Sequence, residues 1–282
     1  TVSNPSVYLV GRQEIEETEL SRFLSSNDVE SWETDTDVAA QKLVEVAGRT
    51  CYMSFSKPRP GGNHAYIDHI LEVGHGSVLE HAVFNLVIEG VSRSFTHELV
   101  RHRAGMGYSQ LSQRYVDEKD CKFVVPPGLA SEVDEAEQAI ELFGCSASSL
   151  LDEGRITGSC AVGLTWIVAM QRAQSDYSYF SDYLQSKLSH LPDATSRRKA
   201  AREAARSVLP NATETKIFVT ANARALRHFI EMRGNPAADA EIRLVALAVL
   251  VALKAEAPNL FGDYEVESTS GVLAATTKYR KV

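Results

Sequence analysis

The sequence predicts a mixed α and β protein of the α+β class, rich in helix. Long segments with helical hydrophobic spacing fill the second half of the chain, and short apolar segments typical of strands lie between helical ones. No glycine-rich dinucleotide turn appears, and strands and helices do not alternate regularly, which argues against a doubly wound fold. The 282 residues allow one large domain or two small ones.

The first hundred residues alternate between short strands and helices. Val7–Val10 is an apolar run expected to form an opening strand. Asp37–Cys51 and Tyr66–Val73 have helical spacing. Apolar residues then occupy every second position from Ala82 to Ile88, which predicts a strand, and Ser92–Arg103 is again helical.

The remainder is predominantly helical. Phe123–Val125 and Lys216–Thr220 are expected to be short strands. Helices are predicted over Ser131–Glu153, Thr157–Leu188, Asp193–Val208, Asn222–Arg233 and Ala237–Lys254. The last dozen residues, about 270–282, are small and polar and are predicted to be a disordered tail.

Composition narrows the function classes. A net charge of −8 argues against a general nucleic-acid binder, and 44% hydrophobic with 23% charged residues is typical of a soluble globular protein. The longest apolar run, Leu244–Leu253, is too short to cross a bilayer. Four cysteines without a paired spacing indicate reduced, mostly buried thiols. We therefore expect a cytoplasmic protein without a membrane segment or structural metal.

The most informative segment runs from Arg101 to Tyr115. It holds three arginines, a histidine, two serines and two glutamines, a composition suited to binding a polyanion such as a nucleotide phosphate. Gly105 and Gly107 lie between its two halves and predict a loop there. Because the chain as a whole is acidic, this local cluster of arginines indicates a binding site and not a general basic surface.

Two other groups of basic residues allow both a structural and a functional interpretation. Arg198, Arg202 and Arg206 follow one another at helical spacing and alone would usually form a solvated face. Arg233 continues the apolar stripe of its helix, so it should either form an ion pair or contact a ligand. Six histidines between His64 and His102 suggest a metal, but their spacing matches no ligand motif.

Taken together, these segments resemble the flavin-dependent thymidylate synthases. The resemblance rests on Arg101-His102-Arg103 followed by Leu111–Tyr115, on Gly74–His81, on Arg206–Pro210 and on Asn222–Arg233, in the family's order. It implies a single domain over residues 1–282, with a central antiparallel sheet, that assembles as a homotetramer with shared active sites. It also implies reductive C5-methylation of a uridylate with FAD, NADPH and methylenetetrahydrofolate.

The resemblance also assigns site residues. Residues expected to contact FAD are Ser77, His81, Arg101, His102, Arg103, Asn222, Ala223, Arg224 and His228. Residues expected to hold the nucleotide are Glu98, Gln110, Leu111, Ser112, Gln113, Arg114, Arg206 and Arg233.

Among these, the catalytic candidates are Arg233 and Ser112. Arg233 would stabilise negative charge developing on the uracil ring, whereas Ser112 has no assured base and is assigned to positioning. Arg114 and Arg206 would bind the 5′-phosphate as charge-assisted forks. None of the cysteines lies in an arginine-rich segment, so a cysteine nucleophile is not expected.

The chain departs from the family pattern after Arg103. Eight residues, Ala104–Leu111, separate it from Ser112, where the family has seven, and Ala237 replaces a frequent histidine. A longer glycine-bearing loop could admit a ribose 2′-hydroxyl. This favours a UMP methylase of nucleoside-antibiotic biosynthesis, with an ordinary dUMP-specific thymidylate synthase as the alternative. A non-catalytic protein that binds flavin and nucleotide is the alternative of another class.

Overall fold

The computed structural model describes residues 1, 4–152, 154, 156–269 and 271–280. The chain divides into two compact units whose segments interleave along the sequence, and the single domain over residues 1–282 stays a prediction. Unit 1 comprises Thr1–Asn4, Glu89–His97 and Gln110–Ile217. Unit 2 comprises Pro5–Ile88, Glu98–Ser109 and Phe218–Val282.

A four-stranded sheet has the order β1-β2-β4-β3. Its strands are β1 (Ser6–Arg12), β2 (Val83–Ser92), β3 (Met106–Gln110) and β4 (Glu214–Asn222). Alternate residues of β2 and β4 are buried, because successive side chains of a strand point to opposite faces. The mixture of helices with an antiparallel sheet confirms the predicted α+β class.

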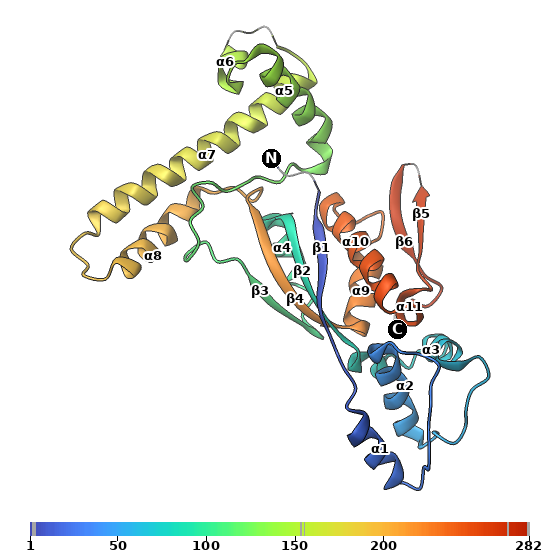
Figure 1. The fold of residues 1–282 in the computed structure, drawn as a ribbon. Coiled ribbons are helices and arrows are strands. Elements are labelled where there is room, and N and C mark those ends of the chain that lie inside the picture. Colours follow the sequence, from blue (N-terminus) through green and yellow to red (C-terminus); the bar gives the residue numbers. More distant parts are fainter. Residues whose placement is uncertain (2–3, 153, 155, 270, 281–282) are drawn as a thin grey trace. The chain divides into compact units, whose positions relative to one another are not determined.

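In unit 1 the helices pack mainly on one another. They are α5 (Ala130–Phe143), α6 (Ala147–Asp152), α7 (Ser159–Lys187) and α8 (Ala194–Ala205), with short 3-10 turns η2 (Pro127–Leu129) and η3 (Arg206–Val208). Val133, Ala136 and Leu164 form part of their apolar core. A side chain at Gly163 would meet the Glu132 carbonyl oxygen at 1.9 Å, so glycine permits the close approach of α5 and α7. Helices α7 and α8 run beside each other (Figure 1).

Helix α4 (Arg93–Leu99) begins in unit 1 and ends in unit 2. The other elements of unit 2 are α1 (Glu17–Ser25), α2 (Ala39–Tyr52), α3 (Gly62–Glu72), η1 (Gly76–His81), α9 (Ala223–Arg233), α10 (Ala240–Glu256), α11 (Pro258–Phe261), and the hairpin of β5 (Glu265–Thr269) and β6 (Val272–Thr276).

A buried ion pair lies between α9 and the segment after α11 in the core of unit 2. Arg227 of α9 is 2% exposed and donates to both carboxylate oxygens of Asp263, at 2.6 and 2.8 Å. Its guanidinium also lies 4.8 Å from the centre of the Tyr264 ring. Burial raises the pKa of Tyr264 above its ordinary range. Helix α10 contains the apolar run Leu244–Leu253 as a largely buried helix, as predicted.

Several predicted elements differ from those observed. The helix predicted over Ser131–Glu153 is broken at Gly144, whose positive φ of 62° ends α5, and residue 153 lies outside the described residues. Phe123–Val125 forms only an isolated bridge, Phe123 to Thr213, instead of a strand. The predicted loop at Gly105–Gly107 instead leads into β3, because pairing with β4 outweighs the low strand propensity of glycine.

The predicted disordered tail also differs from the structure. Val272–Thr276 forms β6, paired with β5, and the chain is described as far as Arg280. Residues 270, 281 and 282 of that tail lie outside the described residues. Val272–Thr276 joins a hairpin because β5 supplies hydrogen-bond partners, which the composition of the tail does not reveal.

Within the described part of the chain, no helix is long and apolar enough to span a membrane. In the same residues, no three His, Cys, Asp or Glu side chains gather so as to hold a metal ion. The four cysteines are free, but Cys51 is exposed and the other three are half-buried, so the prediction of mostly buried thiols is wrong.

Candidate functional site

In unit 2 the segment after Arg103 packs on the start of α9. Asn222 caps α9, since its side chain accepts a hydrogen bond from the Ala225 amide at 2.8 Å. The Asn222 amide donates to the Gly105 carbonyl at 3.0 Å. Gly105 has φ +70°, and a side chain there would lie 2.5 Å from Nδ2 of the Asn222 side chain. Glycine is therefore required by both the backbone conformation and the close contact.

Two adjacent pockets flank this contact, and they share Ala104, Ala225 and His228. The first has a volume of about 580 Å³ and is lined by Glu80, Ala104, Gly105, Asn222, Arg224, Ala225, Arg227, His228, Glu231, Met232, Tyr264, Tyr279 and Arg280. The second, of about 520 Å³, is lined by Arg101, His102, Arg103, Ala104, Met106, Ala225, His228 and Arg233. Six of the predicted FAD residues thus meet at these two pockets.

The other predicted FAD residues occupy different positions. Ser77 and His81 lie on η1, where both side chains are exposed, and neither lines the two pockets. Ala223 is fully buried at the start of α9, and its amide donates to the Ala82 carbonyl at 2.7 Å. Among the six residues that line the pockets, Arg224 forms an ion pair with Glu80, also of the first pocket, at 2.6 Å.

Arg233 is held from two sides. Its Nη1 donates to Glu98 Oε2 at 2.6 Å and its Nε donates to His102 Nε2 at 3.0 Å. The structure thus gives Arg233 an ion pair and also places it in the wall of the second pocket. Because both partners orient one planar guanidinium, its remaining N–H groups have a fixed direction.

His102 accepts this hydrogen bond as a neutral imidazole. Burial lowers the pKa of His102 from 6.5 to about 4, helped by the positive charge of Arg233 and by His228 and Arg101 nearby. The ring packs edge-on against the rings of His228 and Phe229, at centroid distances of 5.8 and 5.4 Å. At neutral pH its Nε2 lone pair is available to Arg233.

In unit 1 the predicted nucleotide segment forms a tight turn after β3. The Leu111 amide donates to the Lys216 carbonyl at 2.9 Å, which fixes the start of the turn to β4. Gln110 Nε2 donates to the hydroxyls of Thr96 and Thr215, at 3.1 and 3.4 Å. The Ser112 carbonyl then accepts from two amides further along, so the turn is closed by its own backbone.

This turn carries buried donors that find no partner among the described residues. Gln113 is 5% exposed, and its side-chain Nε2 has no hydrogen-bond acceptor there. The Nε of Arg114 is likewise buried without an acceptor, although its Nη2 pairs with Glu203 at 2.6 Å. Buried polar groups are nearly always hydrogen-bonded, so these donors fit a ligand rich in acceptor oxygens, such as a nucleotide.

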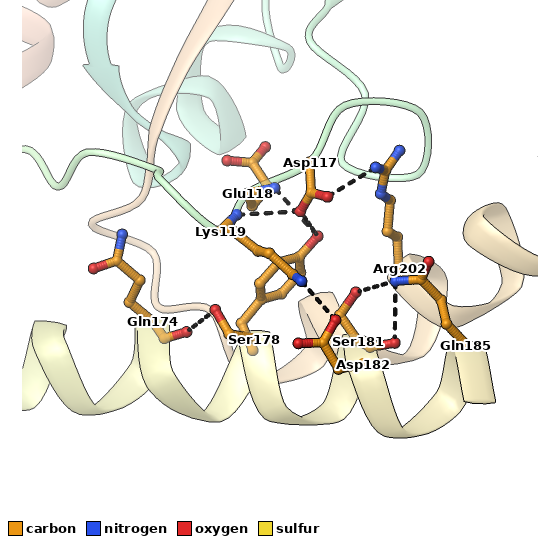
Figure 2. A network of polar contacts seen from close by, with 10 residues as sticks. Asp117, Glu118, Lys119, Gln174, Ser178, Ser181, Asp182, Gln185 and Arg202 are labelled. Atoms are coloured by element: carbon orange, nitrogen blue, oxygen red, sulfur yellow. Dashed lines mark hydrogen bonds and ion pairs between the residues drawn. The ribbon is translucent and has the colours of Figure 1, made fainter. Parts of the chain in front are cut away.

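A polar network in unit 1 fixes the chain that follows the turn (Figure 2). Arg202 of α8 donates to the Tyr115 carbonyl at 2.7 Å and to Asp117 at 2.8 Å. The hydroxyl of Tyr177 on α7 accepts from the Glu118 amide at 3.2 Å. Arg202 therefore has a structural role, and of its predicted stripe Arg206 remains the candidate ligand.

Arg93 is a candidate site residue that could not be recognised in the sequence. Its buried Nη1 has no partner among the described residues, and it interacts electrostatically with Glu118 and Arg206. Burial raises the pKa of Glu118, which is 4% exposed, to about 7, although the charge of Arg93 opposes the rise. Arg93 stands alone at a strand–helix junction, and no sequence spacing connects it to the arginine-rich segments.

Comparison of the sequence with known proteins identifies its family. The family model described as thymidylate synthase complementing protein matches residues 34–259. Flavin-dependent thymidylate synthases of Mycobacterium tuberculosis (strain ATCC 25618 / H37Rv) and Mycobacterium avium (strain 104) are each 46% identical over 258 residues, covering 90% of this chain and 91% of theirs. That of Mycolicibacterium gilvum is 44% identical over 260 residues, covering 91% and 92%.

The chain belongs to the flavin-dependent thymidylate synthase family. This confirms the resemblance seen in the sequence, and with it an FAD-dependent enzyme of the methyltransferase type that uses folate and a reductant. Guanidinium groups, amides and apolar walls, as found in the two pockets, suit flavin and nucleotide ligands. The names of the relatives favour the dUMP alternative over the UMP methylase that the sequence analysis put first.

Proposed function

We propose that the protein methylates dUMP at C5, with methylenetetrahydrofolate as carbon donor and NADPH as the reductant of FAD. The observation that carries this proposal is the match to enzymes named flavin-dependent thymidylate synthase over nine-tenths of the chain. FAD supplies the hydride chemistry when bound, while the chain's own residues bind and orient the reactants.

The structure also weakens the argument for UMP. The longer segment after Arg103 was interpreted as room for a ribose 2′-hydroxyl. The space at Gly105 is instead filled by the Asn222 amide, and Ala104 and Gly105 line the first pocket of unit 2. Gly105 of this longer segment therefore packs against the start of α9.

Arg233 is the proposed catalytic residue. Electrostatic stabilisation requires a charge that is already oriented before the reaction, and Glu98 with neutral His102 orients this guanidinium. Its N–H groups would bind the uracil edge and stabilise negative charge as C5 reacts. Glu98 would thus act on the nucleotide through Arg233.

The turn of unit 1 is the proposed nucleotide-binding segment. Arg114 and Arg206 would bind the 5′-phosphate, and Gln113 would use its unpaired side-chain amide on the same ligand. Gln110 and Leu111 fix the turn to the sheet, and the Ser112 hydroxyl accepts from the Arg114 amide at 3.4 Å, which supports a positioning role. The homotetramer with shared sites would bring such a segment and the pockets of another chain together.

The purified enzyme can be tested for tritium release from dUMP or UMP labelled at C5, with FAD, NADPH and methylenetetrahydrofolate present. We expect release from dUMP, with a kcat/KM at least roughly tenfold above that for UMP. Equal or faster release from UMP would overturn the choice of substrate. A yellow protein that NADPH bleaches but that releases no tritium from either nucleotide would support the non-catalytic binding protein. The cytoplasmic location stays a prediction.

A further inference from the structure

The first pocket of unit 2 has a wall that lies outside the family match. Tyr279 and Arg280 line it together with Asn222, Arg224 and His228. The family model ends at residue 259, twenty residues before Tyr279. Residues 277–280, which we call the closing segment, therefore add side chains to this pocket that the family pattern does not describe.

Hydrogen bonds fix the chain just before the closing segment and within it. Before it, the Ala275 amide donates to the Gly234 carbonyl at 2.9 Å, which joins β6 to the end of α9. A side chain at Gly234 would lie 2.9 Å from the Ala275 side chain, so glycine permits this contact. Within the segment, Thr277 donates to Asp263 and the Tyr279 hydroxyl donates to Asp68 at 2.6 Å. The position of Tyr279 and Arg280 is thus set by unit 2 itself.

The pocket combines guanidinium groups with apolar and aromatic walls. Arg280 pairs through Nε with Glu231 at 3.1 Å and its side chain is 67% exposed, so its Nη groups can donate to a ligand. Arg224 pairs with Glu80 and is 45% exposed. Met232, Tyr264 and Tyr279 supply apolar and ring surface. Phosphates pair with guanidinium forks, and planar bases pack on such surfaces.

We propose that the closing segment completes the cofactor pocket and that Arg280 binds the diphosphate of the dinucleotide. This inference rests on the proposed function for the presence of FAD. Arg224 and Arg280 would exchange part of their contact with Glu80 and Glu231 for phosphate oxygens. Tyr279 holds Arg280 in place through its bond to Asp68.

The test is the affinity of flavins for the apoprotein, measured by quenching of flavin fluorescence. For R280A we expect the Kd of FAD to rise about tenfold, in line with the loss of a charge-assisted hydrogen bond at an exposed site. The Kd of riboflavin, which lacks the diphosphate, should stay unchanged. R280K keeps the charge and should recover part of the affinity.

Arg12→Ala is a matched control. Arg12 is also in unit 2, is 68% exposed and pairs with Glu256 at 3.0 Å, but it does not line the pocket. It should leave the Kd of both flavins unchanged. A rise in the KM for NADPH in R280A, with an unchanged Kd of FAD, would support the diphosphate contact and show that the diphosphate is that of NADPH.

Unchanged FAD and NADPH binding in R280A would overturn the inference. An equal loss of riboflavin and FAD binding would also overturn it, because the variant would then have damaged the pocket as a whole. Wild-type protein that binds FAD and methylates dUMP separates this failure from failure of the proposed function. A wild-type protein that does neither would overturn both.

Discussion

Lowering the pH from 7 to 5 should destabilise the wild-type protein through His102. Because the pKa of His102 is about 4 in the folded protein and 6.5 ordinarily, the unfolded chain binds the proton more tightly. The stabilising contribution is complete above about pH 6.5 and is lost as the pH falls toward 4. Protonation would also place a cation at 3.0 Å from the Arg233 Nε, where an acceptor is needed.

The magnitude follows from these two pKa values. Between pH 7 and pH 5 they give at most roughly 2 kcal/mol in the free energy of unfolding. The ring is only half-buried, and solvent screening reduces this to about 1 kcal/mol. For a chain of this size, that corresponds to a melting temperature lower by roughly 2–4 °C.

The assay compares the thermal unfolding of wild type and H102Q at pH 7 and pH 5. Glutamine can accept from Arg233 through its side-chain oxygen but does not titrate, so all other groups cancel in the difference. We expect the wild type to lose about 1 kcal/mol more than H102Q. Parallel losses in the two proteins, or an imidazole pKa of 6 or above by NMR, would refute the reasoning.

Three further predictions concern other charged groups. The pKa of Glu118 is raised from 4.5 to about 7 in the folded protein, so the wild type loses stability as the pH rises from 4.5 through 7. At pH 8 the variant E118Q should therefore be more stable than wild type by roughly 1–3 kcal/mol, whereas at pH 5 it should not be. A pH-independent difference in melting temperature would contradict this. D263N leaves Arg227 buried without its carboxylate and should cost about 3–5 kcal/mol in urea unfolding, whereas a loss below about 1 kcal/mol would argue against the pair. R233K cannot keep two oriented contacts and should lower kcat roughly 100-fold in the tritium assay, while a change in KM alone would indicate a binding role.

Helices could be predicted where the hydrophobic period was long. α7 (Ser159–Lys187) and α9 (Ala223–Arg233) agree with the predicted ranges to within two residues at either end. The strand β3 and the β5–β6 hairpin were missed, because neighbouring strands that the local sequence does not reveal supply their hydrogen bonds.

The candidate site shows the same division. The arginine-rich segment and Arg233 were found because their residue types are unusual for a core. Arg93 was missed because a single arginine carries no pattern, and only burial reveals its unpaired nitrogen.

By itself the sequence determined the family, because the family's motifs are defined by residue types and their order along the chain, which do not depend on the tertiary structure. It also predicted which charged residues would contact flavin and nucleotide. Only the tertiary structure decided the protonation of these residues and the space around them. Burial makes His102 a neutral acceptor for Arg233, and packing on Asn222 fills the space at Gly105 that had suggested a ribonucleotide. Protonation and free volume depend on neighbours brought together from distant parts of the chain, and so no local pattern records them.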